Sequence, residues 1–191
     1  VTLAYADSDT LLISGRGKGV GIRLDFLPGE AFDFIQPVLS GKDTWYLADC
    51  FKNYMRYMLF NQAGRIALHQ EWKGSNSEFC QLDVLEENGE FLLVLEEVRD
   101  SWINRNISYD IQEVCRNARE DFERFYQSMP SVPEEYEDAR EKAAYVNWSS
   151  IVNKLGLLKR DAMFMSKNWM CNVWSWDHCF NALALAYHNP K

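Results

Sequence analysis

Three tryptophans, one aspartate and one histidine lie close together near the C-terminal end of this sequence. Trp169, Trp174 and Trp176 fall within eight residues, and Asp177 and His178 follow the last of them directly. An indole offers a flat apolar face on which a sugar ring can stack, and a carboxylate accepts hydrogen bonds from sugar hydroxyl groups. These residue types at this spacing predict a surface that contacts carbohydrate.

The same residues also admit a purely structural interpretation. The tryptophans would then belong to the core. Asp177 would cap the N-terminus of the following helix, where free N–H groups and the helix dipole favour a carboxylate. Three indoles on one short loop are difficult to bury together, however, and a loop held by a rigid helix is a common place for a binding site. We therefore expect the Asp177 side chain to point into an open pocket.

Helices are expected to position this cluster. Asp110 and Glu113 stand at the spacing of a capping box, and apolar residues recur behind them at helical intervals. A second helix is expected to begin near Ser131–Glu134 and to end at Gly156. The residues that line one face of it are Tyr136, Ala139, Ala143, Val146 and Ser150. A loop over residues 157–173 then leads to a third helix, from about 175 to 187.

Residues 1 to about 104 show the alternation of β-strands. The side chains expected to share one side are Ile66, Leu68, Gln70 and Trp72 in one strand and Cys80, Leu82 and Val84 in the next. Turn sequences at 62–64 and 87–89 flank these strands, and the second contains Asn-Gly, the strongest short hairpin signal. Four consecutive strand-and-turn units favour an antiparallel meander in a sandwich. Earlier strands are expected over residues 11–14 and 20–26.

The order of the elements predicts the fold class. Strands come first and helices follow, which indicates an α+β protein with segregated modules and not a chain of βαβ units. The β-rich part is expected over residues 1–104 as an antiparallel β-sandwich, and the helical linker over residues 105–160.

From about residue 161 onward the sequence resembles family 63 of the glycoside hydrolases, which includes processing α-glucosidases, bacterial α-glucosidases and mannosylglycerate hydrolases. The family pattern is an aromatic-rich loop, then Trp-Asp, then a helix that begins an (α/α)6 barrel. The residues that carry it here are Trp169, Trp174, Ser175, Trp176, Asp177, His178, Phe180 and Asn181. The expected sandwich followed by linker helices also matches the family. The resemblance is specific over residues 161–191 and architectural over residues 1–160.

The resemblance implies the N-terminal portion of an inverting α-glycoside hydrolase acting on α-glucosides or α-mannosides. Residues 161–191 would form the first loop and helix of a truncated catalytic barrel. Inversion needs one carboxylic acid to protonate the leaving oxygen and a second carboxylate to activate water. In the family both acids lie downstream of the first barrel helix. No catalytic residue is therefore assigned in this chain, which is expected to be inactive alone.

Residue roles in the −1 subsite are likewise implied by the resemblance. Asp177 would contact the glycone sugar and help to order water, and Trp174 and Trp176 would form the subsite wall, with Trp169 as a further candidate. For His178 we keep two interpretations open, namely packing of the helix or a hydrogen bond to Asp177.

Two further function classes compete with the enzyme. The first is a non-catalytic carbohydrate-binding module in which the sandwich is the functional part. The second is a structural interaction domain whose tryptophans are core. If the chain is such a fragment, its barrel-facing surface is exposed, and that surface could form a homo-oligomer.

Composition narrows the remaining classes. The net charge of -8 and the absence of a basic stripe argue against nucleic acid. No stretch approaches the roughly 20 apolar residues that a membrane span requires. Five cysteines without a CxxC pair indicate reduced thiols and a cytoplasmic location.

Two other stretches contain residue types that could bind a cofactor or a metal, but neither has the spacing that such a site needs, so no cofactor or metal is predicted. The glycine-rich stretch over residues 15–21 lacks the Ser or Thr and the spacing of a P-loop, so we interpret it as a turn between two strands; phosphate binding is the weaker alternative. The residues Cys171, His178, Cys179 and His188 lack the spacing of a zinc site.

Overall fold

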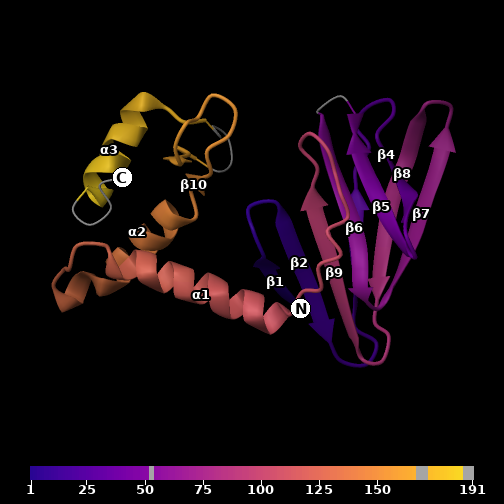
Figure 1. Ribbon diagram of the computed structural model, residues 1–191, viewed down its shortest axis with the longest axis horizontal. Helices are drawn as coiled ribbons and strands as arrows, with labels where there is room; N and C mark the ends of the chain where they lie inside the picture. Colours follow the sequence, from indigo (N-terminus) through magenta and orange to yellow (C-terminus); the bar gives the residue numbers. More distant parts are fainter. Residues whose placement is uncertain (52–53, 167–171, 187–191) are drawn as a thin grey trace. The chain divides into compact units, whose positions relative to one another are not determined.

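The computed structural model describes residues 1–51, 54–166 and 172–186. These residues form a mixed α+β protein with antiparallel sheets and three α-helices (Figure 1), which confirms the predicted class at this level. The chain divides into two compact units, Val1–Cys115 and Arg116–Lys191. The boundary lies beyond residue 104 and inside helix α1 (Ile111–Gln127), because Ile111 is buried against strand residues of the first unit.

The described part of the first unit contains nine strands in two sheets. Their bounds are β1 (Thr2–Tyr5), β2 (Thr10–Arg16), β3 (Gly21–Phe26), β4 (Phe34–Ser40), β5 (Asp43–Cys50), β6 (Met55–Ala63), β7 (Arg65–Lys73), β8 (Asn76–Leu85) and β9 (Glu90–Glu97). A six-stranded sheet has the order β1-β2-β9-β6-β5-β4, and a three-stranded sheet has the order β3-β8-β7. Pro37 lies on β4, the edge strand, where a residue without an N–H is tolerated.

The four-strand meander predicted from the sequence is wrong. β7 and β8 do form a hairpin, but β6 pairs with β9 in the other sheet. The chain changes sheet between β6 and β7 and changes back between β8 and β9. The second crossing uses Asn88 and Gly89 at φ values of 55° and 83°. This left-handed pair reverses the chain in either setting, so it did not distinguish a hairpin from a crossing between sheets.

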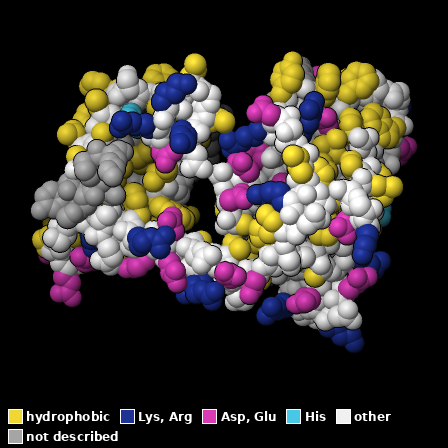
Figure 2. Space-filling model, in the orientation of Figure 1, with side chains coloured by type: hydrophobic (Ala, Val, Ile, Leu, Met, Phe, Trp, Pro, Cys, Tyr) yellow, Lys and Arg dark blue, Asp and Glu magenta, His cyan; other side chains and the backbone are white. Residues whose placement is uncertain are grey.

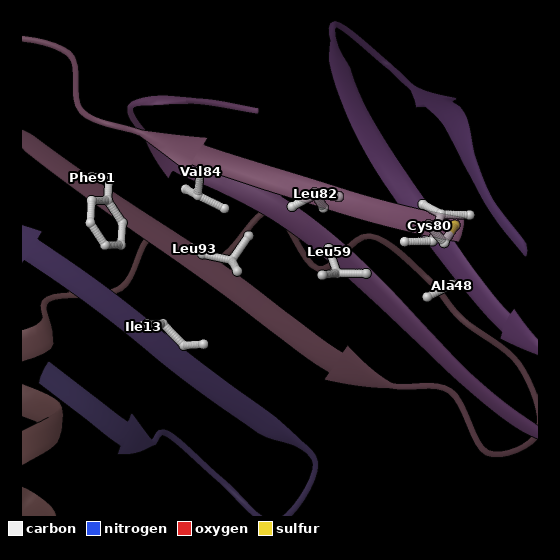
Figure 3. Close-up of a cluster of buried hydrophobic side chains, with 9 residues drawn as sticks. Ile13, Ala48, Leu59, Cys80, Leu82, Val84, Phe91 and Leu93 are labelled. Atoms are coloured by element: carbon white, nitrogen blue, oxygen red, sulfur yellow. The ribbon is translucent and has the colours of Figure 1, made fainter. Parts of the chain in front are cut away.

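A hydrophobic core fills the space between the two sheets (Figure 3). Members from the six-stranded sheet include Ile13, Ala48, Leu59, Phe91 and Leu93, and members from β8 are Cys80, Leu82 and Val84. Each of the three β8 residues is at most 1% exposed, so the alternation predicted for this strand is confirmed. The two sheets thus pack as the layers of a sandwich.

The inward face predicted for β7 is confirmed for Ile66, Leu68 and Gln70 but is wrong for Trp72, which follows a register shift and is 46% exposed. Ile66 and Leu68 pack against the core, and Gln70 reaches across to the other sheet. The Oε1 atom of Gln70 accepts hydrogen bonds from the backbone N–H of Ile35 at 2.8 Å and from the thiol of Cys80 at 2.6 Å. A polar side chain at this position therefore has partners.

The segment over residues 99–110 is fixed against the opposite face of the six-stranded sheet. On that face Trp45 stacks on Phe60, with ring centroids 4.8 Å apart, and meets Trp102 edge-on at 4.7 Å. Glu96 is only 7% exposed and accepts hydrogen bonds from Trp102 Nε1 at 2.7 Å and from Arg105 Nη2 at 3.0 Å. Because a buried carboxylate is costly without partners, these two contacts hold the segment in place.

The second unit begins with most of α1 and continues into α2 (Glu137–Trp148) through a 3-10 turn, η2 (Glu134–Tyr136). The predicted N-terminus of α1 is confirmed, since the Asp110 carboxylate accepts the backbone N–H of Gln112 at 2.8 Å. The predicted end of the second helix at Gly156 is wrong. The hydroxyl groups of Ser149 and Ser150 bind helix carbonyls of the preceding turn, and such bonds compete with continuation of the helix.

The face of α2 that packs is not the one that the sequence pattern marked. Tyr136 and Val146 are more than half exposed, whereas Ala144 is fully buried. Arg140 is the centre of the packed face, with a side chain only 12% exposed. Its guanidinium donates to the carbonyls of Tyr126 and Met129 at 3.1 and 3.0 Å and to Glu137 at 3.1 Å, and lies 4.2 Å from the centre of the Tyr126 ring. A charged residue therefore holds α1 to α2.

The region predicted as a loop over residues 157–173 contains regular structure. β10 (Ile151–Val152) pairs with β11 (Ala162–Met163) in a short antiparallel ladder. Both residues of β11 are buried. The ladder precedes helix α3 (Ser175–Leu185), close to the predicted start at residue 175.

Within residues 1–51, 54–166 and 172–186, no helix is both long enough and apolar enough to cross a bilayer. The longest helix described, α1, carries charged residues along its whole length.

Candidate functional site

The candidate site lies at the start of α3. Trp174 is the N-cap residue, with φ −97° and ψ 132°, and its carbonyl accepts the backbone N–H of His178 at 2.9 Å. Asp177 stands in the first turn, where the dipole of the helix favours a negative charge. Asp177 is therefore not the N-cap residue. The N-cap residue, Trp174, makes no side-chain hydrogen bond that caps the helix.

The β10–β11 ladder positions the chain that leads into this helix. The backbone N–H of Phe164 donates to Ser150 at 2.9 Å, and that of Met165 donates to Asn172 at 3.2 Å. Met163 on β11 is buried, and β11 contacts α3. The start of α3 thus rests on hydrogen-bonded backbone on its N-terminal side.

Two of the three predicted indoles are exposed. Trp174 is 49% exposed and Trp176 is 73% exposed. Trp176 contacts Phe180 one turn later in an edge-to-face arrangement, with ring centroids 5.4 Å apart. The interpretation of these two tryptophans as core residues is therefore wrong. Trp169 lies outside the described residues.

The two polar members of the cluster are half-buried. Asp177 and His178 follow each other on α3, and no hydrogen bond joins their side chains in the described structure. The Nδ1 atom of His178 is buried and has no hydrogen-bond partner. Of the two interpretations kept for His178, a bond to Asp177 is thus not formed here. The exposed indoles and the Asp177 carboxylate together offer a stacking surface and hydrogen-bond acceptors.

One feature of α3 was not recognised from the sequence as a surface. Trp176, Phe180 and Leu183 are 73%, 57% and 73% exposed, and their spacing of four and three residues places them on one side of the helix. No residue of α3 is buried. The periodicity is visible in the sequence, and by itself it predicts a packed face. It does not tell whether a partner surface is present to cover that face.

A hollow between α1 and α2 was also not predicted. It encloses about 430 Å³ and is lined by Phe122, Asp138, Glu141, Lys142, Tyr145 and Val146. Lys142 pairs with Asp138 in the first turns of α2. The spacing of the lining residues on α2 is helical and could have indicated a stripe, but the contribution of Phe122 depends on how the two helices pack.

The glycine-rich stretch forms a turn between β2 and β3, as predicted. Gly17 and Gly19 have φ values of 133° and 75°. The N–H of Gly19 donates to the carboxylate of Glu86 at 3.1 Å, and that of Gly89 donates to the other oxygen at 2.7 Å. Both hydrogen bonds lower the pKa of Glu86, and the one from Gly19 has the larger effect. A carboxylate of the protein therefore occupies the backbone donor that a phosphate would need.

The predicted metal candidates are only partly within the described structure. Cys171 and His188 lie outside it, while His178 is half-buried and Cys179 is exposed. Across the described residues, no group of three His, Cys, Asp or Glu side chains could hold a metal ion.

The chain was then compared with known proteins. No protein-family model matches it, and no curated protein matches it in sequence. The function must therefore be argued from the site itself.

Proposed function

We propose that the chain is the N-terminal portion of an inverting α-glycoside hydrolase that acts on α-glucosides or α-mannosides. In this proposal the first unit is the β-sandwich domain, α1 and α2 form the linker, and α3 is the first helix of an (α/α)6 barrel. Asp177 binds the glycone sugar in the −1 subsite and helps to order the hydrolytic water. Trp174 and Trp176 form the wall of the subsite, and Trp169 is a further candidate for it.

One observation carries the proposal, namely that two exposed indoles and a half-buried carboxylate stand within four residues at the start of a helix. Exposing an indole forgoes roughly 1.5–3 kcal/mol of burial free energy. A stacked sugar ring would recover part of that free energy. The carboxylate would accept hydrogen bonds from two hydroxyl groups.

The apolar side of α3 supports the barrel part of the proposal. In an (α/α)6 barrel the first helix packs against neighbouring helices. Phe180 and Leu183 are the kind of side chains that such neighbours would cover. The proposal implies further helices downstream of Lys191, and the general acid and general base would stand on their loops.

A longer version of the protein, extended past Lys191 with its downstream residues, tests the proposal. It should hydrolyse an α-linked glucose or mannose disaccharide, and NMR should detect the inverted anomer as the first product. Asp177→Asn should lower kcat/KM by about 100-fold or more, because the site loses a charged hydrogen-bond acceptor. Trp174→Ala and Trp176→Ala should mainly raise KM.

Asp100→Asn is the matched control, since Asp100 is an exposed aspartate of the first unit. It should leave kcat and KM unchanged. If Asp177→Asn hydrolyses the disaccharide as fast as the unsubstituted protein, the role of Asp177 is wrong. If no α-linked glucoside or mannoside is cleaved, the enzyme class is wrong.

A further inference from the structure

A second aromatic surface lies in the first unit and is not part of the site on α3. The loop before β4, the turn after β5 and the β7–β8 hairpin meet at one end of the two sheets, where hydrophobic side chains gather on the surface (Figure 2). We define the aromatic end as Phe32, Phe34, Phe51, Tyr54 and Trp72. Tyr54 is 85% exposed, and Phe32, Phe51 and Trp72 are each about half exposed. A surface with this many exposed rings marks an interaction site.

Ring contacts join the three segments into one surface. Phe32 and Phe51 meet edge-to-face with centroids 5.8 Å apart. Phe34 from the six-stranded sheet and Trp72 from the three-stranded sheet lie at the same centroid distance, 5.8 Å. The backbone N–H of Phe32 donates to Ser75 in the β7–β8 turn at 2.9 Å. The aromatic end therefore spans both sheets.

The backbone holds two of these rings outward at a cost. Phe32 and Tyr54 have φ values of 67° and 54°, in the left-handed region that bulky side chains rarely adopt. The loop that presents Phe32 is fixed by Asp33, whose Oδ2 accepts the N–H groups of Gly29 and Glu30, both at 3.1 Å. The loop that carries Phe32 is thus held in place before any ligand arrives, which reduces the entropy lost on binding.

The polar groups around the rings favour a neutral ligand that donates hydrogen bonds. Asp33, directly after Phe32, is 8% exposed, and its Oδ1 atom is buried without a partner. Arg56 pairs with Asp49 at 3.2 Å, and Lys73 pairs with Glu78 at 2.8 Å. Among the described residues, Arg56 and Lys73 are therefore engaged with carboxylates and Asp33 adds a further carboxylate, so these residues have little attraction for phosphate or anionic lipid.

We propose that the aromatic end binds a neutral oligosaccharide chain, with its rings stacked on the C–H faces of successive pyranose units. Rings dominate the exposed apolar residues here, whereas a surface for a lipid or an apolar peptide would be rich in aliphatic side chains. This binding surface lies on the sandwich and does not depend on the role proposed for Asp177.

Affinity electrophoresis of the 191-residue chain tests this proposal. Native gels containing glycogen, yeast mannan or hydroxyethyl cellulose should retard the protein in at least one case. Trp72→Ala should weaken that retardation about 10-fold, and Trp72→Phe should restore part of it because a ring is retained. Phe32→Gly should weaken it as well. We expect this last variant to stay folded, since glycine adopts a positive φ without strain, and circular dichroism checks that a loss of binding is not due to unfolding.

Two matched variants separate this surface from the rest of the molecule. Tyr136→Ala removes an exposed ring from the second unit, and Tyr5→Ala removes an exposed ring from β1 of the first unit. Both should be retarded like the unsubstituted chain. Absence of retardation in all three gels overturns the proposal. So does retardation that is lost with Trp176→Ala but kept with Trp72→Ala, or flotation with phosphatidylcholine vesicles in place of polysaccharide binding.

Discussion

The two units of the molecule are stabilised by different means. In the first, two sheets enclose a hydrophobic core in which Leu59, Leu82 and Leu93 have no exposed surface. In the second, the described buried hydrophobic residues are few and small or flexible, namely Met129, Ala144, Ala162 and Met163. Its helices α1 and α2 are instead held together by Arg140, and α3 buries no residue. The comparison teaches that the first unit is a complete scaffold, whereas the second displays apolar surface available to ligands or further structure.

The largest expected effect comes from breaking the core of the first unit. Leu82→Ala removes buried methyl groups between the sheets and should lower the free energy of unfolding by about 2–5 kcal/mol. Chemical denaturation followed by circular dichroism measures this change. Leu183→Ala on α3 is the control, because Leu183 is 73% exposed, and it should change the free energy by less than about 0.5 kcal/mol.

The two leucines also test the comparison itself. If Leu183→Ala destabilised the chain as much as Leu82→Ala, α3 would be covered by another surface in solution, and its apolar side would not be free.

The next largest loss of stability is expected from substitutions of glycines where the chain crosses between the sheets. A Cβ atom at Gly64 would lie 2.5 Å from the carbonyl oxygen of Leu85 and 2.8 Å from Cβ of Phe91, at a φ of 81°. Gly89 has a similar φ of 83° but open space around it. Gly64→Ala should therefore cost more than about 2 kcal/mol, and Gly89→Ala about 1 kcal/mol. Thermal denaturation of both variants measures the difference. Equal losses would show that backbone conformation alone, and not packing between the sheets, sets the cost.

The fold was predictable where one signal had one structural meaning. The alternation from Cys80 to Val84 and the cap at Asp110 depend on local geometry, and both are confirmed. The Asn88-Gly89 turn was misinterpreted because a left-handed pair reverses the chain whether or not the flanking strands pair. The edge strand β4 was not predicted; it contains Pro37, and its existence depends on pairing with β5.

The site was predictable in composition and less so in environment. The start of α3 and the place of Asp177 in its first turn follow from the sequence and agree with the structure. Exposure of Trp176 was expected because three indoles close together are difficult to bury. Exposure of Phe180 and Leu183 could not be derived, because an apolar helical pattern indicates only that a side favours burial. The aromatic end was missed for a different reason. Phe32 and Trp72 are forty residues apart in sequence, and only the packing of the two sheets brings their neighbourhoods together.

An intermediate effect is expected from Arg140, which tests whether a polar contact sustains the second unit. Arg140→Met keeps a long side chain but leaves the carbonyls of Tyr126 and Met129 without their donor. The loss should be about 1–3 kcal/mol of local stability in the helical unit. Hydrogen exchange read by mass spectrometry should show faster exchange in α1 and α2, with the exchange of β8 and β9 unchanged. Faster exchange in the strands as well would mean that the two units unfold together.

The smallest effect concerns an ion pair on the outer side of the three-stranded sheet. Arg23 donates to both oxygens of Asp83, at 2.6 and 2.8 Å, and His69 lies 3.3 Å away. The hydrogen bond from Arg23, followed by the charges of Arg23 and His69, lowers the pKa of Asp83 below its ordinary 3.8. A carboxyl group with a lowered folded-state pKa contributes its full stabilisation above the unfolded value, and the contribution disappears as the pH falls through the folded value.

Asp83→Asn should therefore have a lower melting temperature than the unsubstituted chain at neutral pH, and the gap should close as the pH falls below 3.8. The gap should also shrink in high salt, because Arg23 is half exposed and its charge is screened. Asp100→Asn, at an exposed aspartate of the same unit, should show no such pH dependence. A gap that stays constant through acid pH would assign the loss to packing or geometry on the sheet. The first unit would then owe nothing to this pair of charges, and the contrast with the Arg140-centred second unit would be sharper still.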